Sequence, residues 1–227
     1  KHGEELDIAV DPLEGTNFTA NDQPNALSVL AVTKKGDLLN APDTYMEKIA
    51  IGPKLPRNLL DLDFSVERNI ELLSNAKKTS PENLRACILK RPRHNKIVNS
   101  LKSLGVKINF ITDGDVSGVI SVANSSADIY LGIGGAPEGV LAAAALSCLD
   151  CQMQTRIVIQ NDNERKRAID IGIRDFNKKY YIDDMVRGDV IFCASGVTDG
   201  DLVKGIKDLG NKFQAETLVL HKSSATN

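Results

Sequence analysis

In the second half of the chain, short apolar runs alternate with segments whose apolar residues recur at helical spacing. Strands are predicted over residues 84–91, 106–112, 127–134, 155–159, 189–197 and 215–223. Helices are predicted between them, over residues 94–105, 115–124, 137–149, 163–176 and 199–210. This alternation of strands and helices predicts a layered α/β fold.

The first half of the chain has a less regular pattern. A strand is predicted over residues 7–10, and a hairpin around the turn Lys34–Asp37 would pair residues 26–33 with 37–42. Residues 52–65 contain prolines and lack periodicity, which indicates a loop. In residues 66–78, Val66, Ile70 and Leu73 recur at helical spacing and predict a helix.

Composition narrows the class of protein. The 227 residues are 42 % hydrophobic and 26 % charged, with a formal net charge of −2 and 4 % aromatic residues. This balance is typical of a globular protein and gives no basic surface for nucleic acid or an anionic membrane, so neither is expected as a partner. The apolar stretch Leu131–Leu149 is interrupted by Gly134, Gly135, Pro137 and Glu138, which predicts a loop leading into a buried helix.

Four cysteines follow no disulfide pattern, which favours a reducing compartment and therefore the cytoplasm. Cys148 and Cys151 form a Cys-x-x-Cys pair, but no second pair follows. We interpret them as structural thiols on one buried helix face, in preference to a zinc or redox site.

The stretch "DPLEGT" places Asp11 and Glu14 at the end of a predicted strand. Like charges repel and are costly to desolvate, so their proximity suggests a divalent cation such as magnesium or manganese, which prefers oxygen ligands. Gly15 would let the backbone approach a phosphoryl oxygen, and Thr16 could orient a water molecule. The alternative is a solvated loop with a local turn.

Two further motifs carry candidate chemistry. In "GIGGAPEGV", residues 132–140, a glycine run leads into a helix start that suits an anion, and Glu138 could face a metal shared with Asp11. Helix capping by Glu138 is the alternative. In "KRPRH", residues 90–94, arginine offers a bidentate fork for phosphate, although a basic surface turn is equally consistent.

The tetrapeptide "TDGD" occurs twice, at residues 112–115 and 198–201. Asp113 and Asp115 of the first copy could hydrogen-bond sugar hydroxyls, whereas the second copy is interpreted as an ordinary strand–turn–helix connection. The basic motif, the glycine run and the first copy all follow predicted strands, whose carboxyl ends bind ligands in open α/β sheets. Together they indicate a substrate with phosphate at two places and hydroxyls between.

These motifs resemble one known family. The segments "DIAVDPLEGTNF", "NAPDTYMEK", "KRPRHNKIV", "ITDGDVSG" and "GIGGAPEGV" are similar to those of class II fructose-1,6-bisphosphatases, and the resemblance runs from about Asp7 to His221. The "DPLEGT" element alone is shared more widely among lithium-sensitive, metal-dependent sugar and inositol phosphatases.

The resemblance implies roles for particular residues. The metal ligands would be Asp11, Glu14 and Glu138, holding Mn²⁺ or Mg²⁺. The catalytic residues would be Thr16, which helps to activate the attacking water, and Glu14. The substrate contacts would be Glu14, Gly15, Thr16, Tyr45, Arg91, Pro92, Arg93, Asp113, Gly114, Asp115 and Gly135.

The family also implies a layered α-β-α-β-α fold with mixed sheets. Residues 1–80 would carry the "DPLEGT" metal site and residues 81–227 the sugar-phosphate-binding loops. The implied reaction is hydrolysis of the 1-phosphate of fructose-1,6-bisphosphate in gluconeogenesis, and some members also accept sedoheptulose-1,7-bisphosphate. The implied protein is cytoplasmic, binds a small sugar bisphosphate and forms homo-oligomers, dimers or tetramers.

Family members carry a further segment before the "DPLEGT" strand, with a lysine and two more acidic metal ligands. We expect that segment to be disordered or cleaved rather than naturally absent. Two alternatives stay open: an inositol- or nucleotide-phosphate monoesterase of the same superfamily, and a non-catalytic module that binds sugar phosphates.

Overall fold

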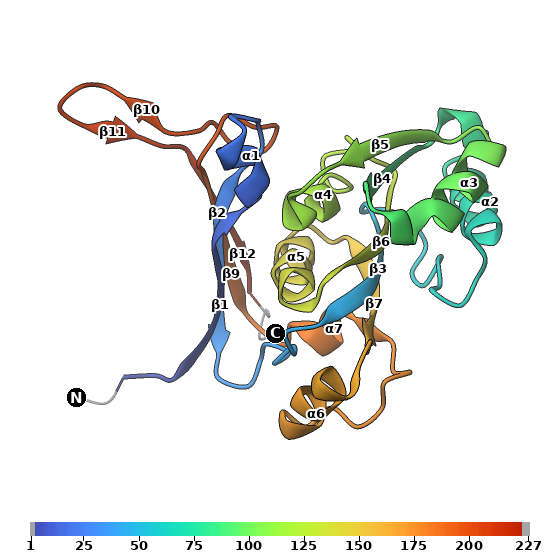
Figure 1. The fold of residues 1–227 in the computed structure, drawn as a ribbon, viewed down its shortest axis with the longest axis horizontal. Helices are drawn as coiled ribbons and strands as arrows, with labels where there is room; N and C mark the ends of the chain where they lie inside the picture. The colour runs from blue at the N-terminus through green and yellow to red at the C-terminus, as the bar shows by residue number, and fades with distance from the viewer. Residues whose placement is uncertain (1–2, 224–227) are drawn as a thin grey trace.

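The computed structural model describes residues 3–223, which form two main β-sheets with helices between and outside them (Figure 1). The strands are β1 (Leu6–Glu14), β2 (Leu27–Lys34), β3 (Tyr45–Ile51), β4 (Arg85–Leu89), β5 (Lys107–Ile111), β6 (Ile129–Gly135), β7 (Gln152–Val158), β8 (Tyr180–Tyr181), β9 (Val190–Gly196), β10 (Lys207–Asp208), β11 (Phe213–Gln214) and β12 (Thr217–Lys222). The α-helices are α1 (Thr16–Ala20), α2 (Val66–Ala76), α3 (Asn95–Ser103), α4 (Asp115–Ile120), α5 (Ala136–Cys148), α6 (Asp162–Asp170) and α7 (Ile182–Met185).

The first sheet is antiparallel, in the order β1-β2-β9-β12. Successive side chains of each strand point to opposite faces of this sheet, as in any β-strand. The β1–β2 register is regular up to Asp11, which lies opposite Val29, and then shifts before Glu14. A shift of this kind bends a strand and redirects its side chains, so Glu14 leaves the regular alternation just where the acidic motif lies.

The second sheet is mixed, in the order β5-β4-β6-β3-β7-β8. Strand β4 is parallel to β5 and β6, whereas β3 runs antiparallel to both of its neighbours, β6 and β7. Each sheet therefore combines strands from residues 1–80 with strands from residues 81–227, and the two parts do not form separate layers.

Helix α5 occupies the centre of the structure. It contacts strands of both sheets, and with α4 it lies between them in Figure 1, while α2 and α3 cover the far face of the second sheet. Its buried residues include the four alanines of residues 142–145, whose small side chains leave room for the two sheets to pack on either side. The prediction of a buried helix here is confirmed. Among the helices of residues 3–223, none has the length and apolar character needed to cross a membrane.

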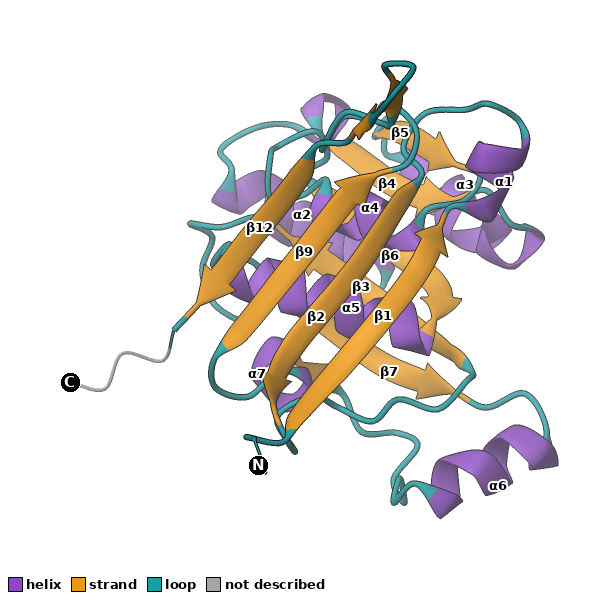
Figure 2. Ribbon diagram, turned by 90° about the vertical axis from the view of Figure 1, so that its left-hand side faces the viewer, coloured by secondary structure: helices purple, strands orange, loops and turns teal. Residues whose placement is uncertain are grey.

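The predicted α/β class is confirmed, and within residues 3–223 the layers run sheet, helices, sheet, helices, which are four of the five layers that the family resemblance implies. In Figure 2 no helix of residues 3–223 lies over the outer face of the first sheet. That face is rich in exposed apolar side chains. They include Leu6, Ile8 and Val10 of β1, Ile191 of β9 and Val219 of β12.

Two of the predicted helices and strands do not form. The turn at Lys34–Asp37 forms, but β2 pairs with β1 and β9, so both of its edges are occupied and residues 37–42 cannot add a hairpin strand. Residues 199–210 are not helical. Gly200, Gly205 and Gly210 interrupt this segment, and a Cβ at Gly205 would lie 2.4 Å from the carbonyl carbon of Thr198. Glycines lower helix propensity, and this close approach requires one.

Candidate active site

The acidic motif lies where β1 ends and α1 begins. The Asp11 Oδ1 atom accepts a hydrogen bond of 3.0 Å from the backbone nitrogen of Leu13, which is the local turn given above as the alternative to a metal site. Glu14 is buried, and Gly15 follows with a φ of 82°, a left-handed conformation that glycine adopts without strain. Thr16 is the first residue of α1 and is exposed.

The first "TDGD" copy packs directly against this motif. Asp113 accepts a hydrogen bond of 3.0 Å from the backbone nitrogen of Asn17, and the Val116 nitrogen donates one of 2.7 Å to Oε1 of Glu14. The ring of Phe18 lies beside both left-handed glycines, where a Cβ on Gly15 or Gly114 would approach to 2.7 Å. The two turns, about a hundred residues apart in sequence, are therefore locked together.

Asp115 is buried and held by two side chains that sequence reasoning missed. The Lys48 ammonium forms an ion pair with Oδ2, and the Tyr130 hydroxyl donates to Oδ1. Lys48 lies on β3 and is 1 % exposed, so its charge depends on Asp115 for compensation. Burial, followed by the charge of Asp115, raises the pKa of Tyr130 well above its ordinary value, which keeps the hydroxyl protonated as a donor.

The glycine run brings the end of β6 to the same place. A Cβ on Gly134 would collide with the Asp115 carboxylate, and one on Gly135 would collide with the Glu138 carboxylate. Glu138 lies in the first turn of α5. Its Oε2 atom is the one buried side-chain oxygen or nitrogen of residues 3–223 that lacks a hydrogen-bond partner, so helix capping does not account for this oxygen.

Arg93 lies beside β6 at the same end. Its guanidinium donates two hydrogen bonds, of 3.1 and 2.8 Å, to the Ile133 carbonyl and lies 4.5 Å from the centre of the Tyr45 ring. Within the described residues Arg91 donates only to the neighbouring Lys90 carbonyl, and Pro92 begins a short 3-10 helix. The structure thus joins Arg93 and Tyr45, but not the Arg91 side chain, to the glycine run.

The His94 ring holds β6 in place beside Arg93. The backbone nitrogen of Ile133 donates to its Nε2 at 2.8 Å, so the proton is on Nδ1, which donates to the Leu89 carbonyl at 2.7 Å. Burial, together with the charge of Arg93, lowers the pKa of His94. The sequence placed His94 in a basic motif, but its ring is buried and neutral, and it positions the strand that carries Gly134 and Gly135.

Several carboxyl groups lie close together in this site, and their proximity changes how they ionise. Burial, and next the charges of Asp115 and Asp11, raise the pKa of Glu14 to about 9 despite the hydrogen bond from Val116. The Oε2 atom of Glu138 is a further carboxyl oxygen of this site, buried without a hydrogen-bond partner. Oxygen donors of this kind fit a hard divalent cation. Within residues 3–223, no three His, Cys, Asp or Glu side chains are gathered tightly enough to hold a metal by themselves.

Most of the predicted site residues therefore lie in one continuous region. Direct contacts run from Asp11 and Glu14 to the 113–115 turn, from there to Gly134, Gly135 and Glu138, and through Ile133 to Arg93 and Tyr45. Lys48 could have been noticed because it interrupts an apolar strand on the same face as Met46 and Ala50, both buried. No comparable signal pointed to Tyr130, an ordinary aromatic residue in an apolar run.

Comparison with known proteins agrees with this geometry. All of residues 1–227 match the family described as "Bacterial fructose-1,6-bisphosphatase, glpX-encoded". Similar curated proteins include "Fructose-1,6-bisphosphatase 1 class 2" of Escherichia coli K12, 41 % identical over 240 residues, and "Fructose-1,6-bisphosphatase class 2" of Haemophilus influenzae, 38 % identical over 240 residues. The alignments cover 99 % of this chain, and 71 % and 72 % of these relatives.

A third relative carries two activities in its name. "D-fructose 1,6-bisphosphatase class 2/sedoheptulose 1,7-bisphosphatase" of Synechococcus sp. is 35 % identical over 237 residues, which cover 98 % of this chain and 68 % of that protein. The chain thus matches a little over two thirds of the length of each of the three relatives.

Proposed function

Because the chain belongs to the family of bacterial, glpX-encoded fructose-1,6-bisphosphatases, we propose that it takes part in hydrolysis of the 1-phosphate of fructose-1,6-bisphosphate. The products would be fructose 6-phosphate and inorganic phosphate. Sedoheptulose-1,7-bisphosphate, named for the Synechococcus relative, is a second substrate to test. The same reasoning supports a cytoplasmic, gluconeogenic enzyme that forms dimers or tetramers.

One observation carries this proposal: an arginine stacked on a tyrosine ring and a turn rich in carboxylates lie at the same end of the second sheet. Arg93 stacks on Tyr45, while Glu14, Asp113 and Asp115 lie across the glycine run from them. A bisphosphate needs a cationic site for one phosphate, acceptors for its hydroxyls and a separate centre for the phosphate that is cleaved. The arrangement offers all three.

The chain's own residues have distinct tasks in this proposal. Arg93 would give up its bonds to the Ile133 carbonyl and bind the phosphate that is retained, as a bidentate fork. Asp113 and Asp115 would accept hydrogen bonds from sugar hydroxyls, with Asp115 fixed in orientation by Lys48 and Tyr130. The backbone of Gly15 would approach the reacting phosphoryl group, and the Thr16 hydroxyl would orient the attacking water.

Asp11, Glu14 and Glu138 would hold Mn²⁺ or Mg²⁺, because carboxylate oxygens suit a hard divalent cation and the buried Oε2 atom of Glu138 lacks a hydrogen-bond partner. A bound divalent cation supplies positive charge that stabilises the phosphoryl group and promotes ionisation of water. Glu14 must then be ionised, so the raised pKa in the absence of a metal predicts that metal binding releases a proton from this group.

Kinetics of Thr16→Ala test the catalytic assignment. We expect kcat on fructose-1,6-bisphosphate to fall by about a hundredfold or more, with a much smaller change in KM, because the hydroxyl acts on the attacking water. Thr19→Ala, an exposed threonine of the same helix, is the matched control and should keep its activity. An unchanged kcat in Thr16→Ala would remove Thr16 from the reaction.

Arg93→Ala separates a bisphosphatase from a monoesterase. The variant should raise KM for fructose-1,6-bisphosphate while leaving hydrolysis of a simple sugar monophosphate almost unaffected, since that substrate lacks the second phosphate. Full activity on the bisphosphate would instead favour an inositol- or nucleotide-phosphate monoesterase.

Removal of the metal tests the metal site. Chelation with EDTA should abolish turnover and Mn²⁺ should restore it. Hydrolysis that persists after thorough chelation would exclude a metal-dependent reaction and the proposed role of Asp11, Glu14 and Glu138 as metal ligands.

A further inference from the structure

A cavity lies at the opposite end of β3 from the candidate active site. Tyr45 begins β3 at the site, and Ile51 ends it beside a cavity of about 480 Å³. Seven residues of extended strand place these two ends about 20 Å apart. The cavity is of the size that small-molecule sites usually have, and none of the residues of the candidate active site lines it.

The lining of this cavity divides into an apolar part and a polar part. Met153 of β7 and Ile182 of α7 contribute apolar side chains from one face of the second sheet, and Ile49 and Ile51 of β3 contribute theirs from the other face. All four are buried. Polar groups come from Ser147 at the end of α5 and from neighbouring amides and hydroxyls. A ligand with an apolar body and one polar group would therefore find surfaces for both.

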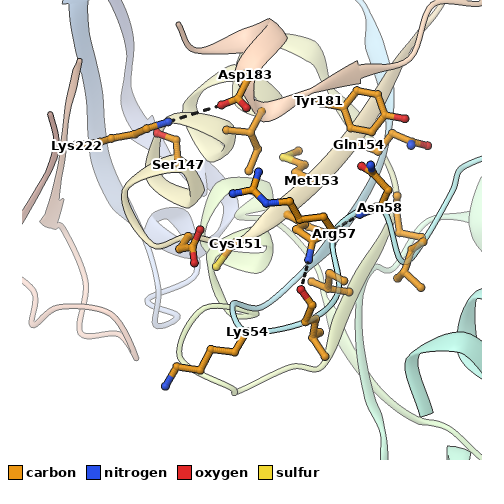
Figure 3. A pocket seen from close by; sticks show the side chains of 18 residues that line it. Lys54, Arg57, Asn58, Ser147, Cys151, Met153, Gln154, Tyr181, Asp183 and Lys222 are labelled. Atoms are coloured by element: carbon orange, nitrogen blue, oxygen red, sulfur yellow. Dashed lines mark hydrogen bonds and ion pairs between the residues drawn. The ribbon is translucent and has the colours of Figure 1, made fainter. Parts of the chain in front are cut away.

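Three cationic side chains line the same cavity: Lys54, Arg57 and Lys222. Neither the Lys54 ammonium nor the Arg57 guanidinium has an ion-pair or hydrogen-bond partner within residues 3–223, whereas Lys222 lies 3.6 Å from Asp183. In Figure 3, Arg57 extends toward the side of the cavity where Ser147 and Lys222 lie, and Lys54 points away. The acidic residues Asp150 and Asp183 also line the cavity, which leaves one positive charge in excess.

The backbone around Arg57 is fixed by a single side chain. The Gln152 Nε2 atom donates to the carbonyls of Leu55 and Pro56, at 3.0 and 3.1 Å, and Oε1 accepts from the nitrogen of Asn58 at 3.0 Å. The amide thus binds the loop on both sides of Arg57. Holding a partnerless guanidinium on an anchored loop reduces the entropy lost when a ligand binds.

We propose that this cavity binds a small organic phosphate, with its phosphate between Arg57 and Lys222 and its apolar body against Met153 and Ile182. The guanidinium fork is the group best matched to a phosphate, and the neighbouring ammonium adds a second charge. This site is separate from the proposed reaction, and its existence does not depend on what the active site hydrolyses.

Calorimetric titration with phenylphosphonate tests the site, because this probe joins an aromatic body to a group that a phosphatase cannot hydrolyse. Arg57→Gln should weaken binding at least tenfold, since it removes a charge-assisted bidentate contact. Arg57→Lys, which keeps the charge without the fork, should lose less. Lys166→Gln, an exposed cation of α6 outside the cavity, is the matched control and should bind as the unaltered protein does.

The Arg93→Gln variant distinguishes binding in this cavity from binding at the candidate active site. Binding of phenylphosphonate in the cavity should persist in Arg93→Gln and be weakened in Arg57→Gln. The unfolding curve and basal turnover of Arg57→Gln should stay unchanged. Equal affinity in Arg57→Gln and the unaltered protein would overturn the proposal, as would a titration abolished by Arg93→Gln. Benzoate binding as tightly as phenylphosphonate would overturn the assignment of phosphate.

Discussion

The two copies of Thr-Asp-Gly-Asp, at residues 112–115 and 198–201, have the same sequence and different structures. In the first, Gly114 adopts a left-handed conformation, α4 begins at Asp115, and that carboxylate is buried. In the second, which follows β9, no helix begins. Its Thr198 hydroxyl oxygen accepts from the Ala26 nitrogen, and Asp199 accepts from the Gly205 nitrogen, so both bond to nearby loops.

The difference shows that distant partners, and not the tetrapeptide itself, decide which copy can take part in chemistry. Asp115 meets Lys48 and Tyr130, and the following nitrogen of Val116 meets Glu14. Asp201 is exposed, and its backbone nitrogen donates to Asn25. Only the first copy is inside a charged, buried network, where removal of one group leaves the others uncompensated.

Removing the last carboxylate of each copy should give the largest contrast. Asp115→Ala leaves the Lys48 ammonium buried without its partner, so we expect the free energy of unfolding to fall by about 3–5 kcal/mol. Asp201→Ala should change it by less than about 0.5 kcal/mol, because that side chain is exposed. Urea unfolding followed by circular dichroism measures both.

A double variant distinguishes lost charge compensation from a general packing defect. Lys48→Met combined with Asp115→Leu replaces the buried pair by apolar groups, so most of the lost stability should return while activity stays low. Equal destabilisation by Asp115→Ala and Asp201→Ala would show that the buried pair contributes nothing specific.

The wide separation of contacting residues along the chain also limits what could be predicted from the sequence. Helix α5 and the motifs at its start were predicted because glycine, proline and a continuous apolar run act locally. Strand β3 was missed, since Glu47 and Lys48 interrupt its apolar pattern. Lys48 is tolerated there only because Asp115, 67 residues later, pairs with it, and no local pattern contains that information.

The predicted site shows the same division. Asp11, Glu14, Asp113 and Glu138 were identified from motifs, and contacts join them to one region of the structure. That Glu138 has a buried oxygen without a partner could not be predicted, because it depends on how β6 and α5 pack around it. Cys148 and Cys151 were expected on one helix face, yet α5 ends at Cys148, and burial raises the pKa of Cys151 to about 12, as fits a structural thiol.

Substitution of the glycine in each copy should give an intermediate effect. Gly114→Ala places a Cβ at a φ of 73° and 2.7 Å from the Phe18 ring, so we expect a loss of about 1–2 kcal/mol from backbone conformation and more from displacement of Phe18. Gly36→Ala, where φ is 87° and no atom lies within 4 Å, isolates the backbone part. Thermal unfolding of both variants and of Gly200→Ala measures the difference.

If Gly114→Ala were no more destabilising than Gly36→Ala, the close approach of Phe18 would carry no weight. Gly200 is not among the positive-φ glycines, so its alanine variant should avoid the backbone cost and strain only the contact with Asn25. A larger loss at Gly200 than at Gly114 would reverse the ranking of the two copies.

The pH dependence of stability reports on the buried histidine behind the first copy. The pKa of His94 is lowered by burial, so the unfolded chain takes up a proton at higher pH than the folded protein does. The stability from neutral His94 is therefore fully present above about pH 6.5 and is lost as the pH falls below it, by at most about 1.4 kcal/mol per pH unit. Urea unfolding of His94→Gln between pH 7.5 and 5 should show a shallower decline, and parallel curves would contradict this account.

The smallest effect expected is a shift in the titration of that histidine. The negative charge of Asp115 raises the pKa of His94 and so opposes the effect of burial. Asp115→Asn, which keeps the shape and an acceptor for Lys48, should lower the pKa of His94 further, whereas Asp201→Asn should leave it unchanged because the second copy is absent from the environment of His94. Titration of the His94 ring protons by NMR measures both variants. If the His94 pKa were the same in the two variants, the charge of Asp115 would have no net effect on His94, because the ion pair with Lys48 would already compensate it.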